Sequence, residues 1–158
     1  MTFEKILVCL DGSKLAEQIL PYATEVALRF DSKVVLLQVV TLPTAFVIPA
    51  VPGAPAIPVQ TPTLLEVVQK EEIEAKEYLE QVAQPLRKRG LQVECVTLQG
   101  SAGQTIINYS IENKIGLIAI STHGRSGLRR LVFGSVADFV LRESGMPILV
   151  IKPQGVEA

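Results

Sequence analysis

The sequence predicts an α/β protein built on an open parallel sheet, and three observations lead to this prediction. Short continuous apolar runs, such as residues 6–10 (ILVCL) and 34–40, are typical of strands that are buried on both faces. Segments between them repeat apolar residues at helical spacing, and this alternation favours right-handed strand–helix–strand units. The 158 residues are 48% hydrophobic and 20% charged, which fits one folded domain.

The first strand–helix–strand unit covers residues 6–40. Its first strand ends at Asp11-Gly12-Ser13, where Ser13 can cap a helix. Apolar residues then recur at helical spacing as far as Phe30, which predicts one helix from Ser13 to Phe30. The second buried strand follows at residues 34–40.

A long neutral segment comes after the second strand, with 32 consecutive uncharged residues between Lys33 and Glu66. A membrane-spanning helix is excluded because prolines interrupt the second half of the run and each removes a backbone donor. These prolines are Pro43, Pro49, Pro52, Pro55, Pro58 and Pro62. Four of them fall at every third residue, the repeat of a polyproline II helix. We interpret residues 42–62 as a Pro-rich insertion in a single domain over 1–158, acting either as a connecting loop or as a lid or partner-docking arm.

The rest of the chain continues the alternation. Thr63-Leu64-Leu65-Glu66 predicts a capping box at the start of a long helix, in which Pro85 is expected to kink or loosen the last turn. Ser101-Ala102-Gly103-Gln104 predicts a second capping box. The other predicted elements are strands at 91–98, 115–120 and 148–151 and a helix at 133–143.

Composition excludes several classes of function. With 15 Lys plus Arg against 16 Asp plus Glu, the chain lacks the broad basic surface of a non-specific nucleic-acid binder. One histidine and two separated cysteines do not supply a tetrahedral metal site. The first residues, MTFEK, lack the charged and apolar regions of a secretory signal, so we expect a cytoplasmic protein.

The strongest chemical candidate is a phosphate-binding loop after the strand at 115–120. Small residues in the stretch 121–127 (STHGRSG) allow backbone N–H groups to approach an anion. Gly134-Ser135 then opens the next helix, whose N-terminus carries unpaired donors and partial positive charge. Neither a Walker-type loop nor a G-x-G-x-x-G dinucleotide fingerprint is present.

The spacing of these residues resembles a known family. Ser121-Thr122-His123-Gly124, nine residues and then Gly134-Ser135 match the motif G-x-x-G-x9-G-[ST] of nucleotide-binding universal stress proteins, except that Ser121 replaces the first glycine. The resemblance includes residues 6–13 and extends to residues 147–152. It covers nearly the whole chain apart from the proline segment.

This resemblance implies a specific architecture. The expected fold is a single-domain, three-layer open sheet of five parallel strands in the order 3-2-1-4-5, with helices on both faces, as in the adenine nucleotide alpha hydrolase-like fold. The nucleotide is expected at the carboxyl ends of strands 1 and 4. A homodimer through the last strand, from Pro147 to Ile151, is also implied. With this order, Cys9 and Cys95 lie roughly 10 Å apart and are expected to be free core thiols.

The same resemblance implies the residues of a nucleotide site. Asp11 would lie beside the ribose and adenine, with Cys9 and Leu10 at the adjoining strand edge and Val39 against the adenine. The residues expected around the ribose and phosphates are Ser121, His123, Gly124, Arg125, Ser126 and Gly127. The outer phosphates would be held by Gly134, Ser135 and Val136. Asp11 is the one candidate to approach a magnesium ion that bridges the phosphates.

The implied function is binding of ATP, ADP or AMP by a stress-responsive sensor or regulator. Our hypothesis is that binding survives the change at Ser121, weakened or shifted in preference among the three nucleotides. One alternative is a slow ATP-hydrolysing or self-phosphorylating enzyme, but no carboxylate is placed as a clear general base. Another is a nucleotide-independent, chaperone-like module that works through the Pro-rich arm. A Ser-His-Asp hydrolase is disfavoured, because residues 124–128 (GRSGL) miss the G-x-S-x-G pattern by one residue.

Overall fold

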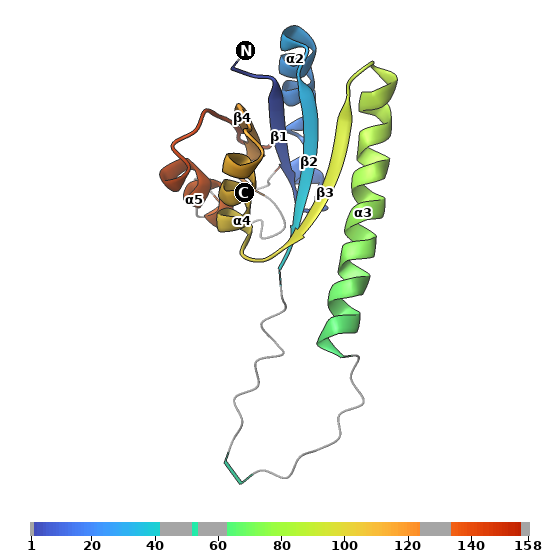
Figure 1. Cartoon of the computed structure of the whole chain (residues 1–158), viewed down its shortest axis with the longest axis vertical. Helices are drawn as coiled ribbons and strands as arrows, with labels where there is room; N and C mark the ends of the chain where they lie inside the picture. Colours follow the sequence, from blue (N-terminus) through green and yellow to red (C-terminus); the bar gives the residue numbers. More distant parts are fainter. Residues whose placement is uncertain (1, 42–51, 54–62, 124–133, 156–158) are drawn as a thin grey trace.

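Five parallel strands in one sheet organise the chain (Figure 1). The computed structural model describes residues 2–41, 52–53, 63–123 and 134–155. The strands are β1 (Lys5–Leu10), β2 (Lys33–Val40), β3 (Val93–Gln99), β4 (Leu117–Ser121) and β5 (Ile148–Ile151). Their order is β3-β2-β1-β4-β5 and every neighbouring pair is parallel, which confirms the expected fold class and strand order.

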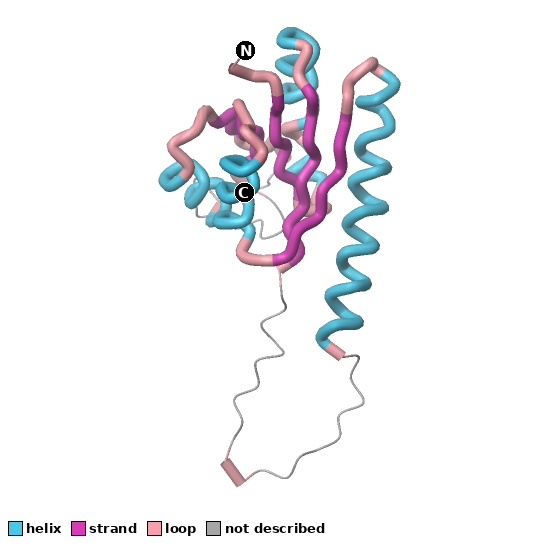
Figure 2. The backbone as a smooth tube through the Cα atoms, in the orientation of Figure 1, coloured by secondary structure: helices cyan, strands magenta, loops and turns pink. Residues whose placement is uncertain are grey.

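Helices cover both faces of the sheet and complete three layers (Figure 2). They are α1 (Lys14–Glu17), α2 (Leu20–Phe30), α3 (Leu64–Lys88), α4 (Ala102–Glu112) and α5 (Ser135–Glu143). The first three pack on one face, where the core includes Ala16, Ala27 and Leu79. The last two pack on the other face, through Ile106 and Val140.

The central strand β1 shows why its sequence is a continuous apolar run. Val8 points into the core under α1, α2 and α3, while Leu7 points into the core under α4 and α5, and both side chains are fully buried. Successive side chains of a strand point to opposite faces, so a strand covered on both faces needs apolar residues at every position. The edge strand β5 is only half-buried along its length.

The predicted helix from Ser13 to Phe30 is wrong as a single helix. The structure has α1 and α2 instead, with the break at Gln18 and Ile19. Pro21 lies in the first turn of α2, where its missing N–H is tolerated because the first donors of a helix have no partner inside the helix. Helix α1 therefore ends and a new helix begins at the proline.

Of the two predicted capping boxes, only the first is confirmed. The Thr63 hydroxyl accepts the Glu66 N–H at 3.3 Å, and the Glu66 carboxylate accepts the Thr63 N–H at 3.2 Å. At the start of α4 the Ser101 side chain makes no capping hydrogen bond. The side-chain amide of Gln104, which should have completed that box, donates instead to Asn108 at 2.8 Å.

Several element boundaries differ from the predictions by one to two residues. Strands β3 and β4 are shifted toward the C-terminus, and α5 begins at Ser135 because Gly134 is an extended N-cap with φ −63° and ψ 154°. Helix α3 continues three residues beyond Pro85 to Lys88. Apart from residues 52–53, the predicted insertion at 42–62 lies outside the described residues.

The two cysteines are free, as expected. Cys9 belongs to the core under α4 and α5, whereas Cys95 packs against the opposite core, so the sheet itself separates the two thiols. Among the described residues, no helix combines the length and the apolar character needed to cross a membrane.

Candidate functional site

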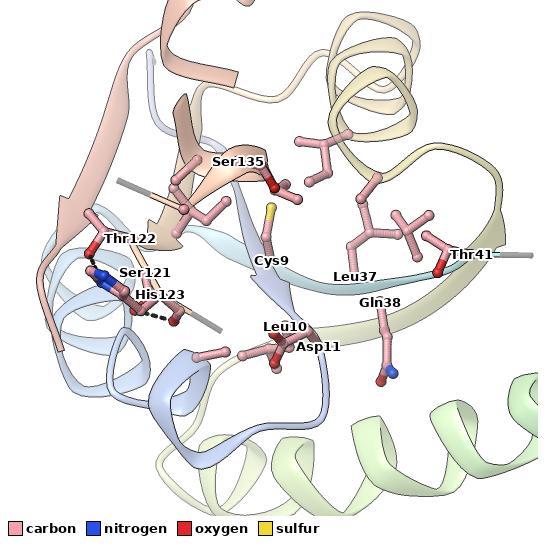
Figure 3. A pocket seen from close by; sticks show the side chains of 18 residues that line it. Cys9, Leu10, Asp11, Leu37, Gln38, Thr41, Ser121, Thr122, His123 and Ser135 are labelled. Atoms are coloured by element: carbon pink, nitrogen blue, oxygen red, sulfur yellow. Dashed lines mark hydrogen bonds between the residues drawn. The ribbon is translucent and has the colours of Figure 1, made fainter. Parts of the chain in front are cut away.

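A pocket of about 290 Å³ lies at the carboxyl ends of β1, β2 and β4 (Figure 3). From β1 the strand order continues to β2 and β3 on one side and to β4 and β5 on the other. The pocket therefore lies at the topological switch point of an open α/β sheet, the general position for ligands in such folds.

All the expected site residues that the structure describes line this pocket. They are Cys9, Leu10, Asp11, Val39, Ser121, His123, Gly134, Ser135 and Val136. The other four expected residues, Gly124, Arg125, Ser126 and Gly127, lie outside the described residues.

The turn after β1 places a carboxylate at the edge of the pocket. Gly12 has φ 85°, a left-handed conformation that glycine adopts without strain. The Asp11 carboxylate accepts the N–H of Ser13 at 2.9 Å, and the Ser13 hydroxyl accepts the N–H of Ala16 at 3.1 Å as the N-cap of α1. Two short-range hydrogen bonds thus fix the backbone that carries Asp11.

The segment after β4 is held by its own side chains. Ser121, Thr122 and His123 are all buried, and the Ser121 hydroxyl donates to the His123 carbonyl at 3.0 Å. The Thr122 hydroxyl and His123 Nδ1 are 2.9 Å apart and hydrogen-bonded (Figure 3). The Thr122 N–H donates to the Ile151 carbonyl at 2.8 Å, which ties the segment to β5.

Ser121 fits the position that the motif gives to glycine. Among the described residues other than glycine, only Asp31 and Lys114 have positive φ, so Ser121 does not need the left-handed conformation that favours glycine. Its hydroxyl has a local acceptor and is not left unpaired in the interior. The serine is therefore accommodated in the backbone as it stands.

Gly134 brings the N-terminus of α5 against the end of β4. Its N–H donates to the Thr122 carbonyl at 2.5 Å, and a Cβ at this position would collide with the same carbonyl oxygen. As the N-cap of α5, Gly134 has no side chain to occupy the first N–H groups of the helix. These donors, together with the helix dipole, favour an anion at this end of the pocket.

The wall between Asp11 and α5 is apolar. Cys9, Leu37, Ile106 and Ile120 line it from both the sheet and α4. Burial raises the pKa of the Cys9 thiol from 9.0 to about 12, so the thiol is protonated at neutral pH and contributes apolar surface, not a nucleophile.

Other residues that line the pocket were not expected from the sequence. Ala102 and Ile106 reach it from α4, and no local pattern distinguishes them from ordinary residues of an apolar helix face. Gln38 did leave a signal, since it is the one polar residue in the run 34–40. In the described residues no group of three or more His, Cys, Asp or Glu side chains could hold a metal ion.

The fold and the pocket define an α/β open-sheet protein with a ligand site at its switch point. The model of the Universal stress protein family matches residues 2–152. The chain belongs to the universal stress protein family, as its motif indicated.

Individual relatives agree with this assignment. Universal stress protein MJ0531 of Methanocaldococcus jannaschii is 30% identical over 150 residues, which are 95% of this chain and 82% of that protein. The solved structure of MJ0577 from the same organism has a TM-score of 0.81 at 23% identity and covers 98% of this chain and 99% of its own. The universal stress protein of Archaeoglobus fulgidus, solved in complex with dAMP, has a TM-score of 0.65 at 24% identity. The match covers 96% of this chain and 100% of that chain. At these identities the two structures show a shared fold.

Proposed function

We propose that this protein binds an adenine nucleotide in the pocket between β1 and β4. The observation that supports this most strongly is the order of chemical groups along the pocket. Figure 3 shows Cys9, which belongs to the apolar wall, between the Asp11 carboxylate and Ser135, the first residue of α5. Ribose hydroxyls donate to carboxylates, a purine packs on apolar surface, and phosphates bind at helix N-termini, so the three parts of a nucleotide match the three parts of the pocket.

The relative from Archaeoglobus fulgidus supports the same proposal, because it was solved in complex with dAMP. We infer that in this chain Val39 contacts the adenine and that Gly134, Ser135 and Val136 bind phosphate, with ATP, ADP and AMP as the candidate ligands.

Calorimetric titration with AMP, ADP and ATP tests the site. Asp11→Asn keeps an oxygen that can accept the Ser13 N–H but removes the charge, and we expect it to weaken binding about tenfold, the loss of one charge-assisted hydrogen bond. Asp31→Asn is the matched control, because Asp31 precedes β2 at the opposite end of the sheet and its left-handed φ of 52° suits asparagine. Equal affinities in the two variants would contradict the assignment of Asp11.

We further propose that the protein acts as a stress-responsive sensor or regulator and does not consume ATP. Asp11 is the only carboxylate among the described residues that line the pocket, and it already accepts the Ser13 N–H in the turn after β1. Incubation with γ-labelled ATP and Mg²⁺ should leave the bound nucleotide intact. Steady release of phosphate or labelling of the protein, with Ser126 or Ser135 as the acceptor, would support the enzyme alternative instead.

A homodimer through residues 147–151 is part of this proposal. Strand β5 is at the edge of the sheet and its residues are half-buried, so one side is available for another chain. Sedimentation at micromolar concentration should give a dimer, and a single monomeric species would overturn this part. If nucleotide binding fails altogether, deletion of residues 43–60 tests whether the Pro-rich arm binds a protein partner on its own.

A further inference from the structure

A second pocket lies on the other side of β2, between the end of that strand and α3. It has a volume of about 290 Å³, and its polar lining comes from Gln38 and Thr41 on the β2 side and from Glu71, Glu74 and Tyr78 on α3. Gln38, Val39 and Thr41 line both pockets, so the end of β2 forms a shared wall. Among the residues assigned to phosphate binding, those that the structure describes do not line this second pocket.

One buried polar atom in its lining, the Gln38 Oε1 atom, has no hydrogen-bond partner among the described residues. Gln38 is only 8% exposed, and Figure 3 shows its amide pointing away from Cys9, toward the green helix α3. An unpaired buried oxygen is unfavourable for folding, so a residue of this kind is expected where a ligand supplies the missing donor.

The electrostatic surroundings of the pocket are negative. Glu71 and Glu74 line it, and among the described residues the one cation paired with either is Lys70, whose ammonium lies 3.8 Å from Glu74 with both side chains largely exposed. Such a surface pair offsets little of the field. Burial raises the pKa of the Tyr78 hydroxyl, and the charges of Glu17 and Asp11 and a hydrogen bond to Glu17 raise it further.

We propose that the second pocket binds a small organic cation that carries a primary ammonium group. An ammonium has three N–H donors and no acceptor, which complements the Gln38 oxygen, the Tyr78 hydroxyl oxygen and the Glu71 carboxylate. An alkyl stem can pack along Val39, Val40 and Ala75, which supply the apolar part of the lining. A divalent metal ion is less suited, because calcium and magnesium need six or more oxygen ligands.

Calorimetry with 1,4-diaminobutane on the full chain tests this proposal. We expect one saturable site, with binding about tenfold weaker in Glu71→Gln, the loss expected for one charge-assisted hydrogen bond. Glu77→Gln is the matched control, since it makes the same change on the same helix at an exposed residue that does not line the pocket. If no saturable binding is found, or if both variants weaken binding equally, the proposal is overturned.

A second variant tests the unpaired oxygen itself. Gln38→Met keeps the length of the side chain and removes the amide, so the ligand-free protein should melt at a higher temperature while diaminobutane binds about tenfold more weakly. Unchanged diaminobutane binding in this variant would overturn the role of Gln38. A parallel titration of wild type with AMP separates the two sites. If AMP binds and diaminobutane does not, only the proposed cation site is contradicted. If diaminobutane binds and AMP does not, only the proposed nucleotide site is contradicted.

Discussion

Gly134 is the residue that sets the distance between α5 and the end of β4. A Cβ there would meet the Thr122 carbonyl oxygen, which is backbone and cannot rotate away. We predict that Gly134→Ala lowers the free energy of unfolding by about 1–3 kcal/mol, the usual range for forced overpacking. Urea unfolding measures this. Ser135→Ala, one residue later and exposed, is the control and should stay within about 0.5 kcal/mol of wild type. Equal stability of both variants would show that the close approach has no energetic consequence.

Ser121 replaces a motif glycine but makes a buried hydrogen bond of its own. Ser121→Gly removes the donor to the His123 carbonyl and adds backbone freedom, so it should destabilise the protein by about 1–2 kcal/mol. Because the backbone at Ser121 is not left-handed, we expect AMP affinity to change less than tenfold, about 1.4 kcal/mol. Much tighter binding by the glycine variant would mean that the serine obstructs the phosphate.

The Cys9 thiol should be unreactive in the folded protein. Its pKa is raised by burial from 9.0 to about 12, so at pH 8 the thiolate fraction falls about a thousandfold. In a Cys95→Ser variant, iodoacetamide should label the native protein at least that much more slowly than the denatured protein. Labelling of native protein at the denatured rate would refute the buried environment.

The same shift has a consequence for stability. The unfolded thiol loses its proton near pH 9 while the folded thiol keeps it to about pH 12. The contribution of the protonated Cys9 thiol to the free energy of unfolding is therefore fully present below pH 9 and is lost as the pH rises from 9 to 12.

At the scale of elements, the N-caps of α3 and α4 can be compared directly, because both are hydroxyl residues and only one caps its helix with its side chain. Thr63 forms both bonds of a capping box, whereas Ser101 makes none with its side chain. Thr63→Ala should lower the stability of the protein by about 1 kcal/mol and Ser101→Ala by only a few tenths. Thermal melts of both variants check this, and a larger loss at Ser101 would contradict the assigned caps.

Elements that are determined by neighbouring residues in the sequence could be predicted, and those that depend on contacts with other parts of the chain could not. The apolar run of β1 and the cap at Thr63 are local patterns, and both are present as predicted. The break between α1 and α2 follows from Pro21, a local signal outweighed by the helical periodicity around it. The capping box predicted at Ser101 does not form, because the Gln104 side chain hydrogen-bonds to Asn108 instead. A sequence motif does not predict which of these neighbours Gln104 will bind.

The candidate site follows the same rule. Ser121 and Gly134 were predicted from a motif with fixed spacing and Asp11 from the family resemblance of residues 6–13, and all three line one pocket. Ala102 and Ile106 were missed because only the packing of α4 on the sheet brings them there. The second pocket was missed for a related reason, since Gln38 and Tyr78 lie 40 positions apart in the sequence and meet only through the packing of α3 on β2.

At the scale of the whole molecule, both candidate sites lie at the end of the sheet where the carboxyl ends of the strands are. The carboxyl ends of β1, β2 and β4 and the N-terminus of α5 meet where β1 separates the two halves of the sheet, and the turn at Asp11 lies there too. The shared wall at the end of β2 then divides this end of the sheet into a pocket suited to an anionic nucleotide and an acidic pocket suited to a cation. Opposite charge preferences on the two sides of one strand make the two sites chemically distinct.

The most direct test of the nucleotide site is an amide NMR titration of the isotope-labelled full chain with AMP. The account predicts saturable shifts of the amides of Asp11, Ser121, Gly134 and Ser135, with Asp31 and the C-terminal half of α3 unchanged. Shifts confined to α3, or no shifts at millimolar AMP, would contradict it.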